Sequence, residues 1–427
     1  MKNICARVAR KRGFIMRAYE RFLKYAAYPT MSDENSGTHP SSAKQLVLGR
    51  ELARELSELG LTNVELDSFG YVYGTLPRNT TVRCNTVALI AHMDTSPDAS
   101  DENIKCQLMT YEGRDLLLNP ELGIYLKRED YPCLDGYVGQ TLIVSDGTTL
   151  IGADDKAGIA EIMTALERLI AENIPHGDIR VCFTPDEEIG EGADNIDMSR
   201  LSADYGYTVD GGALGELEYE NFNAASAKVT VHGRSIHPGS AKDRMINAAR
   251  IVAELNSYLP ERETPEHTSE YQGFYHMTGI SGECETASVS YIIRDHDRTR
   301  FEARKSFFRE VVEKLNRKYG EGVVELNLTD SYFNMREIVE GNMFVVERAR
   351  NAMRAVGVSP ITTPIRGGTD GARLSFMGLP CPNLSTGGEN FHSRFEFVSV
   401  ESMDKMVDVI VRIATDVVGE LCEEINL

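Results

Sequence analysis

The sequence predicts an α/β protein whose main domain has a mixed central sheet and is interrupted by an inserted ferredoxin-like α+β domain. Three observations support this prediction. Apolar runs that end abruptly in histidine or acidic clusters recur in the first half of the chain, as buried strands do where they leave a sheet. The middle of the chain then changes to a β-α-β-β-α-β order of elements. Finally, 427 residues exceed what one hydrophobic core usually sustains, so we expect two domains.

The first motif is the apolar run of residues 87–91, which is followed by His92 and Asp94. Open α/β sheets bind ligands at the carboxyl ends of their strands, so this strand places His92 where a site is expected. Asp94 comes two residues later and points the same way, and we expect it to hold the second ring nitrogen of His92. A solvated strand end would explain this motif equally well if it stood alone.

Further candidate ligands lie close to the ends of other predicted elements or in loops. Asp154 directly precedes a long amphipathic helix, where an ordinary N-cap is the alternative explanation. Glu187 and Glu188 come straight after a predicted strand at residues 179–184, and such a carboxylate cluster is tolerable if a cation neutralises it. Asp210 is a further candidate, at the end of a predicted strand. His392 is another, and it lies among glycines and aromatic residues.

Together these motifs predict a metal centre. Imidazole and carboxylate ligands from separate strand ends suit zinc, cobalt or manganese better than calcium or magnesium. Two ions held roughly 3.5–4 Å apart by a bridging carboxylate would give the arrangement that aminopeptidases use. The candidate ligands are His92, Asp154, Glu188, Asp210 and His392. With five ligands for two ions, one ligand must be shared.

These motifs resemble those of the peptidase T family, tripeptide aminopeptidases of the di-zinc aminoacylase and carboxypeptidase-G clan. The resemblance runs from about residue 19 to the C-terminus, and it is most extensive at residues 152–166, 207–225 and 364–382. It implies a metal-dependent enzyme that releases the N-terminal residue from tripeptides.

The resemblance also implies how two Zn²⁺ ions are held. His92 and Asp210 would bind one ion, Glu188 and His392 would bind the other, and Asp154 would bridge them. Position 393, next to the last ligand, is serine where the family pattern has glycine. If that position needs a positive φ, serine adds strain, so we expect the least regular geometry at His392.

Further roles follow from the same resemblance. Glu187 would be the general base that takes a proton from water and delivers it to the leaving amine. Asp94 would keep its place behind His92. The peptide bond between Asp154 and Asp155 would be cis, which is rare outside proline.

The predicted lid domain spans residues 222–332. Its expected elements are strands at residues 228–231, 273–282, 286–294 and 323–328 and helices at residues 242–259 and 298–319. Because His392 lies beyond this insertion, the main, catalytic domain must be discontinuous and comprises residues 1–221 and 333–427. Residues 1–18 form an extension ahead of the family resemblance, with Met1 or Met16 as the start.

Three residues in or near the lid are expected to contact substrate. By resemblance, His237 stabilises the developing oxyanion. Arg294 and Arg366 carry guanidinium groups suited to the C-terminal carboxylate of a peptide. We rank Arg366 first because glycines follow it, whereas an ion pair with Asp295 is a serious alternative for Arg294. Cations at one end of the substrate and metals at the other would select tripeptides by length.

Composition is compatible with this hypothesis. A formal charge of −20 argues against nucleic acid and anionic membranes as partners, and small peptides are the substrates that the resemblance implies. Eight cysteines without C-x-x-C spacing are typical of reduced thiols, so we expect a cytoplasmic protein. The basic residues at positions 2–12 precede no secretory signal. Residues 100–140 are expected to form an irregular loop.

Other functions remain open at this stage. A dipeptidase, carboxypeptidase or N-acyl amino-acid deacylase of the same clan would keep the metal ligands and differ in the lid. A peptide-binding protein without turnover would have no chemical need for Glu187 beside a ligand. A scaffold whose lid is a dimerisation module would leave the five ligands unexplained. The sequence is compatible with a monomer or a homodimer.

Overall fold

The computed structural model describes residues 15–424, and side chains as far as residue 415. Residues 1–14, most of the predicted extension, lie outside the described part. The chain divides into two compact units. Unit 1 comprises Met1–Glu218, Ile338–Thr362 and Leu374–Leu427, and unit 2 comprises Tyr219–Glu337 and Thr363–Arg373.

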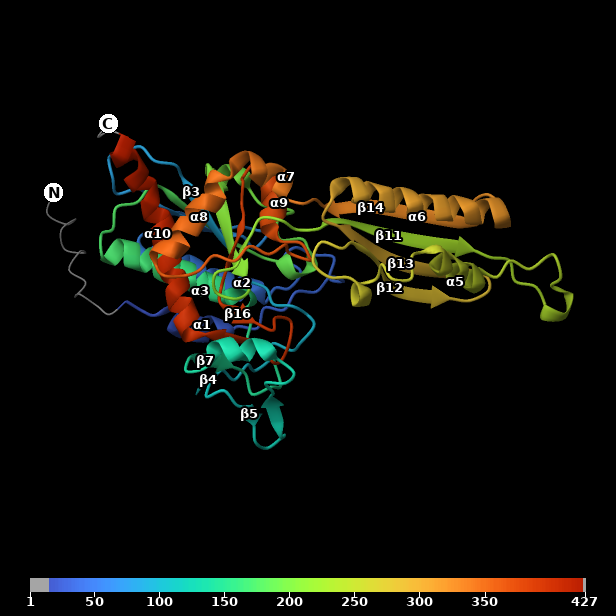
Figure 1. Ribbon diagram of the computed structural model, residues 1–427, viewed down its shortest axis with the longest axis horizontal. Coiled ribbons are helices and arrows are strands. Elements are labelled where there is room, and N and C mark those ends of the chain that lie inside the picture. The colour runs from blue at the N-terminus through green and yellow to red at the C-terminus, as the bar shows by residue number, and fades with distance from the viewer. Residues whose placement is uncertain (1–14, 425–427) are drawn as a thin grey trace. The chain divides into compact units, whose positions relative to one another are not determined.

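Unit 1 is built on a mixed sheet, as predicted. Its four central neighbours, β8, β3, β9 and β15, run parallel, while β1, β2 and β10 pair antiparallel at the two sides. Figure 1 labels β3, the middle strand of this sheet. In sheet order the strands are β1 (Thr62–Leu66), β2 (Val72–Leu76), β8 (Ile179–Thr184), β3 (Val87–His92), β9 (Tyr205–Gly211), β15 (Asn383–Ser385) and β10 (Leu217–Glu218). Every residue of β3 is buried, which is why it is continuously apolar up to His92.

Helices cover this sheet, and α3 is the one that matters for the site. It packs against β3 and β9 and against α1 and α10. A Cβ added at Gly158 would lie 1.9 Å from the carbonyl oxygen of Val209, so only glycine lets α3 approach β9 this closely. The helices are α1 (Ala18–Ala26), α2 (Gln45–Leu59), α3 (Ala153–Ala171), α4 (Met198–Leu201), α8 (Phe344–Ala355) and α10 (Val400–Glu424).

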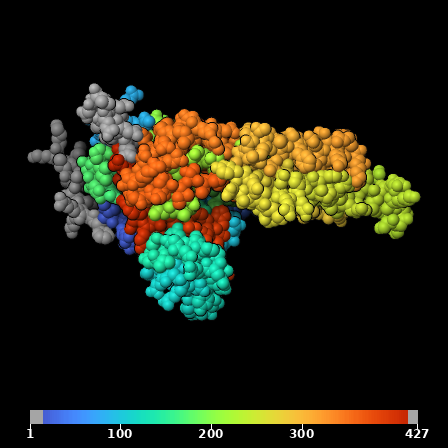
Figure 2. Space-filling model, in the orientation of Figure 1, coloured from blue at the N-terminus to red at the C-terminus, as the bar shows by residue number. Residues whose placement is uncertain are grey.

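The expectation of an irregular loop at residues 100–140 is wrong. The segment contains short strands and its own apolar core, which includes Leu118, Leu134 and Phe397, and Figure 2 shows it in teal as a lobe of unit 1. One sheet has the order β16-β17-β7-β4. The elements are β4 (Gln107–Thr110), the β5 (Leu116–Asn119) and β6 (Ile124–Leu126) hairpin, η1 (Pro132–Tyr137), β7 (Thr141–Val144), β16 (Gly388–Glu389) and β17 (Phe397–Ser399).

Unit 2 has the predicted β-α-β-β-α-β order, which confirms the ferredoxin-like prediction. Its antiparallel sheet has the order β12-β13-β11-β14, and α5 and α6 pack against it (Figure 1). The buried core includes Val229, Ile293 and Phe308. The elements are β11 (Asn223–His232), α5 (Ala248–Tyr258), β12 (Phe274–Gly282), β13 (Thr286–Asp295), α6 (Arg298–Tyr319) and β14 (Val324–Tyr332).

The sequence predicts residues 363–373 in the second part of the main domain, but they group with unit 2. The reason is local pairing, because Ile365 forms a β-bridge with Asn221 and its carbonyl oxygen lies 3.1 Å from His296 Nε2. The remaining short helices are η2 (Glu187–Ile189), η3 (Pro238–Ser240), η4 (Pro265–His267), α7 (Arg336–Val339), η5 (Glu340–Asn342) and α9 (Asp370–Phe376).

Two findings bear on the composition. Within the described residues, no helix combines the length and the hydropathy needed to cross a membrane. Six cysteines of the described part are free thiols, at positions 84, 106, 133, 182, 284 and 381.

Glu161, in the middle of α3, generates a prediction about stability. Its side chain is fully buried, and neither carboxylate oxygen has a hydrogen-bond partner within residues 15–415. Burial, and secondarily the charge of Asp404, raise the pKa of Glu161 well above its ordinary value. Between that ordinary value and the raised one, the folded protein holds a proton that the unfolded chain releases, so stability falls as pH rises.

Glu161→Gln removes this titration. The free energy of unfolding of the variant, relative to that of wild type, should therefore increase from pH 5 to pH 8, because only the wild-type chain releases a proton on unfolding in this range. Urea unfolding at both pH values measures this difference. The exposed Glu172, at the end of the same helix, provides the control variant Glu172→Gln. Parallel pH profiles for Glu161→Gln and wild type would contradict the prediction.

Candidate metal centre

The predicted strand ends meet at one edge of the sheet in unit 1. β3 lies between β8 and β9 and runs parallel to both, with His92 opposite Thr184 at the end of β8. This arrangement brings His92, Asp210 on β9 and Glu188 just beyond β8 to the same edge. The N-terminus of α3 adds Asp154, because Gly158 allows that helix to pack closely on β9.

Asp154 lies between two histidines. His92 Nε2 is 2.8 Å from Asp154 Oδ1 and 3.3 Å from Asp210 Oδ1. His392 Nε2 is 3.4 Å from Asp154 Oδ2 and 2.8 Å from Glu188 Oε2. One oxygen of Asp154 therefore faces each imidazole. All five residues predicted as ligands are brought together, in two groups that share Asp154.

The chemistry of these residues fits metal ions. Three carboxylates and two imidazoles lie together, and Glu188 Oε1 is buried without a hydrogen-bond partner within the described chain. Burial, with the nearby charge of Asp154, raises the pKa of Glu188 to about 8. Burial also raises the pKa of Asp210 to about 7, although His92 opposes this effect. Divalent cations would relieve the desolvation and the repulsion that raise these two pKa values.

The pKa values of the two imidazoles are raised as well. Hydrogen bonds to Asp154 and Glu188 raise the pKa of His392 to about 11. Burial alone would lower the pKa of His92, but Asp210, Asp154 and Asp94 together raise it well above its ordinary value. Without metal, the site therefore holds protons where a metal ligand must present a lone pair, so metal binding would release them.

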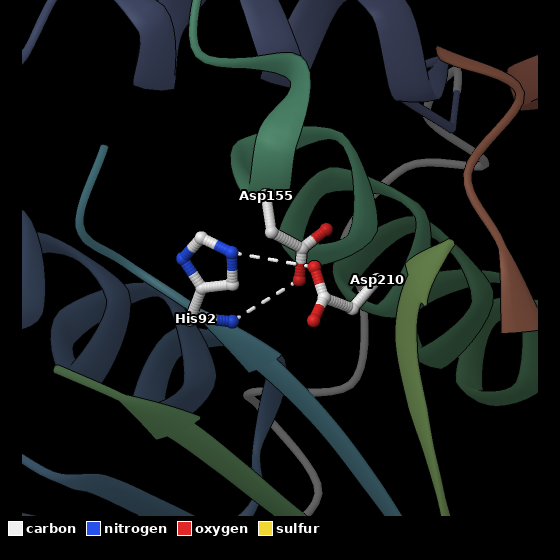
Figure 3. Close-up of side chains that lie close together, drawn as sticks. All are labelled: His92, Asp155 and Asp210. Carbon is white, nitrogen blue, oxygen red and sulfur yellow. Dashed lines mark hydrogen bonds and ion pairs between the residues drawn. The ribbon is translucent and has the colours of Figure 1, made fainter. Parts of the chain in front are cut away.

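A second group of possible ligands overlaps the first and consists of His92, Asp155 and Asp210 (Figure 3). The oxygens of Asp155 already accept backbone N–H groups, from His92 at 3.1 Å and from Gly158 at 3.2 Å. We therefore assign Asp155 to holding the end of β3 against α3. The peptide bond between Asp154 and Asp155 is cis, as predicted.

Asp94 makes more contacts than predicted. Its carbonyl oxygen lies 3.1 Å from His92 Nδ1, and its Oδ1 lies 3.4 Å from the same nitrogen. The carboxylate also accepts the backbone N–H groups of Glu187 at 3.0 Å and Glu188 at 3.1 Å. Asp94 therefore connects His92 to the loop that carries the predicted general base.

The structure also shows neighbours that the sequence analysis missed. Asp98 Oδ2 lies 3.2 Å from His392 Nδ1. Asp186, which has a φ of 58°, accepts the backbone N–H of Ser41 at 2.7 Å and the side-chain amide of Gln45 at 2.6 Å. The expectation about position 393 needs correction, because the positive φ of 59° belongs to His392 itself. The only sequence signal for these contacts is that Asp98 and Asp186 each lie in an acidic cluster.

The predicted substrate contacts lie in unit 2. His237 is exposed, and its Nδ1 accepts the N–H of Gly239 at 3.2 Å. Arg294 donates to the carbonyl oxygens of Ala225 at 3.4 Å and Ile293 at 3.3 Å. Among the described residues it forms no ion pair with Asp295, which is bound by Arg300 and Arg304 instead.

Arg366, the first-ranked candidate, already forms several hydrogen bonds. Its guanidinium donates to the carbonyl oxygens of Glu270 and Gln272 and to Thr268 Oγ1 at 3.1 Å, and it lies over the ring of Phe222. The side chain therefore fastens the loop at residues 268–272. Among the described residues neither arginine pairs with a carboxylate, but Arg366 donates to three residues of this loop, whereas Arg294 donates to the carbonyl oxygens of Ala225 and Ile293.

Comparisons with known proteins place this geometry in a family. The peptidase dimerisation domain family matches residues 219–323, within unit 2. Peptidase T of Caldanaerobacter subterraneus subsp. tengcongensis is 56% identical over 396 residues, which cover 92% of this chain and 97% of the relative. Peptidase T of Clostridium novyi is also 56% identical, over 395 residues and the same shares of both chains.

Solved structures share the fold. Aminopeptidase PepT from Bacillus cereus has a TM-score of 0.75 at 24% identity and covers 96% of this chain and 100% of its own. A tripeptidase from Staphylococcus aureus gives 0.76 at 24% identity, with 95% and 99% covered. A dinuclear metal binding peptidase of the M20 family from Bacillus subtilis gives 0.64 at 13% identity, with 94% and 97% covered.

The relatives at 56% identity confirm the resemblance drawn from the sequence motifs, since the match extends over nearly the whole of both chains. They also confirm that the protein is a peptidase. The chain belongs to the peptidase T family.

Proposed function

We propose that the protein releases the N-terminal residue from tripeptides at a centre that binds two zinc ions. The observation that carries this proposal is the position of Asp154, whose two carboxylate oxygens face His92 on one side and His392 on the other. Asp210 completes the first group and Glu188 the second. Two imidazoles with three carboxylates favour zinc over calcium or magnesium.

Bound zinc ions would act as Lewis acids on water and on the scissile carbonyl group. The remaining steps belong to side chains. Glu187 takes a proton from the attacking water and transfers it to the leaving amine. Its backbone is fixed on both sides, because Asp94 accepts its N–H and that of Glu188. The base is thus held in a constant position relative to a neighbouring ligand.

His237 is the proposed donor to the oxyanion. Because Nδ1 accepts a hydrogen bond from Gly239, the neutral imidazole carries its proton on Nε2. The exposed ring therefore offers an N–H group to the carbonyl oxygen of the substrate, which gains negative charge in the transition state.

Arg294 is the proposed partner of the substrate's C-terminal carboxylate. Burial lowers the pKa of its guanidinium, and Tyr332, over whose ring it lies, opposes this effect. A half-buried cation without a carboxylate partner in the described structure is costly, and an anionic ligand compensates for that cost. Binding of both substrate ends then selects tripeptides over shorter and longer peptides.

We also propose that the protein forms a homodimer through unit 2. The family that matches residues 219–323 is a peptidase dimerisation domain. At the edge of the unit 2 sheet, β12 is exposed over most of its length and carries Ile280, which is 61% exposed. Such an edge invites pairing with another strand.

The free thiols fit a reducing, cytoplasmic location.

Initial rates on peptides of different length test the proposed reaction. Zinc-loaded wild type should hydrolyse free tripeptides and leave dipeptides, tetrapeptides and N-acetylated tripeptides largely intact. Glu187→Gln should lower kcat by about 10²-fold or more, because the proton acceptor is lost. Glu191→Gln, an exposed acid on the same loop, should retain the wild-type rate.

Each contrary result has a defined meaning. Cleavage of dipeptides or acylated amino acids would identify another activity of the clan. Absence of turnover by zinc-loaded wild type would contradict the proposed two-zinc mechanism. Full activity of Glu187→Gln would remove Glu187 from its assigned role.

A second pair of substrates tests Arg294. Arg294→Gln should lower kcat/KM for a free tripeptide by about 10- to 100-fold, as expected for loss of a charged hydrogen bond worth roughly 1.5–3 kcal/mol. The same tripeptide with an amidated C-terminus should be hydrolysed equally by variant and wild type. Arg317→Gln, an exposed arginine on α6, serves as the control. An equal loss with both substrates would show that Arg294 does not recognise the carboxylate.

A further inference from the structure

An acidic residue, Glu396, follows His392 in the C-terminal segment. Glu396 has only 1% of its surface exposed, and it is not among the proposed metal ligands. Its Oε2 accepts the backbone N–H groups of Ile151 at 2.8 Å and Gly152 at 2.9 Å. Its Oε1 accepts the backbone N–H of Asp154 at 3.0 Å. Both oxygens are therefore committed to the short loop that ends in the bridging ligand.

That loop needs an external partner. Gly152 is the N-cap residue of α3, has a φ of 70°, and offers no side-chain cap. Asp154 departs from helical geometry, with a φ of −88° and a ψ of 100°. The first N–H groups of a helix have no acceptor within the helix, and a negative charge near them is favourable. Glu396 supplies both the acceptors and the charge.

Glu396 connects the segment that carries His392 to the loop that carries Asp154. Glu396 is four residues from His392, and its acceptor atoms hold the loop of Asp154, 242 residues away in sequence. β17, which begins next to Glu396, pairs with β7 and keeps the segment in place. Lys156, one turn into α3 and fully buried, interacts electrostatically with Glu396.

We propose that Glu396 is a positioning residue that holds Asp154 in register with His392, so that both metal ions depend on it. The inference rests on the proposed two-metal function. It goes beyond that function because it assigns a specific task to a carboxylate that touches neither metal nor substrate. Since both ions share Asp154, displacing Asp154 weakens the binding of both ions. A disturbance of His392 alone would weaken the binding of only one.

The hydrogen-bond pattern requires a carboxylate. Glutamine has one acceptor oxygen, and its amide group would present N–H donors to one of the backbone N–H groups that Glu396 now accepts. Aspartate keeps two acceptor oxygens but is one methylene shorter. Glu396→Gln should therefore be the more disruptive change, and Glu396→Asp the milder one.

The test measures zinc affinity of the full-length protein by competition with a chromophoric chelator, alongside the melting temperature of the metal-free form. Glu396→Gln should lower the affinity for zinc at both sites by about 10- to 100-fold, which is the range found when a hydrogen-bond partner of a metal ligand is removed. Glu401→Gln is a matched control, because Glu401 lies on the same segment and accepts the backbone N–H of Thr141 at 2.9 Å, at the start of β7. It should bind zinc as wild type does.

Each outcome bears on the inference. Wild-type affinity in Glu396→Gln would overturn it, even if the melting temperature fell, since the contact would then serve stability alone. Weaker binding of only one zinc ion would overturn the claim that both ions depend on Glu396. If Glu396→Gln does not fold, Glu396→Asp decides the question, with a smaller loss at both ions expected and wild-type affinity contradicting it. Failure of wild type to bind two zinc ions would overturn the proposed function itself, and this inference with it.

Discussion

The centre depends on one carboxylate that faces two imidazoles. Asp154 lies 2.8 Å from His92 Nε2 through one oxygen and 3.4 Å from His392 Nε2 through the other. These histidines are 300 residues apart in the sequence, so the fold must bring both to the N-terminus of α3. The parallel strands do so for His92, and the β17–β7 pairing in the lobe does so for the segment of His392.

A layer of buried acids maintains this geometry through backbone contacts. Asp94 holds the N–H groups of Glu187 and Glu188, Asp155 holds that of His92, and Glu396 holds that of Asp154. In each case a carboxylate fixes the backbone of a proposed metal ligand or of the proposed general base. Burying these charges is expensive, and the backbone donors offset much of that expense. The layer explains why so many acidic residues gather at one sheet edge.

The sequence predicted those features that local patterns encode. Continuous apolar runs ending in His92 and Glu187 located the strand ends, and periodicity located the two helices of unit 2. The lobe escaped prediction because its strands are short and pair across distant segments, as Val144 does with Phe397. The engagement of Arg366 by the loop at residues 268–272 escaped for the same reason. Contacts between residues far apart in sequence leave no periodic signal.

Anomalous diffraction from crystals of the zinc-loaded protein tests the central claim most directly. We predict two peaks roughly 3.5–4 Å apart, with Asp154 between them, His92 and Asp210 on one side, and Glu188 and His392 on the other. A single peak, or a pair of ions that excludes Asp154 in favour of Asp155, would contradict the account.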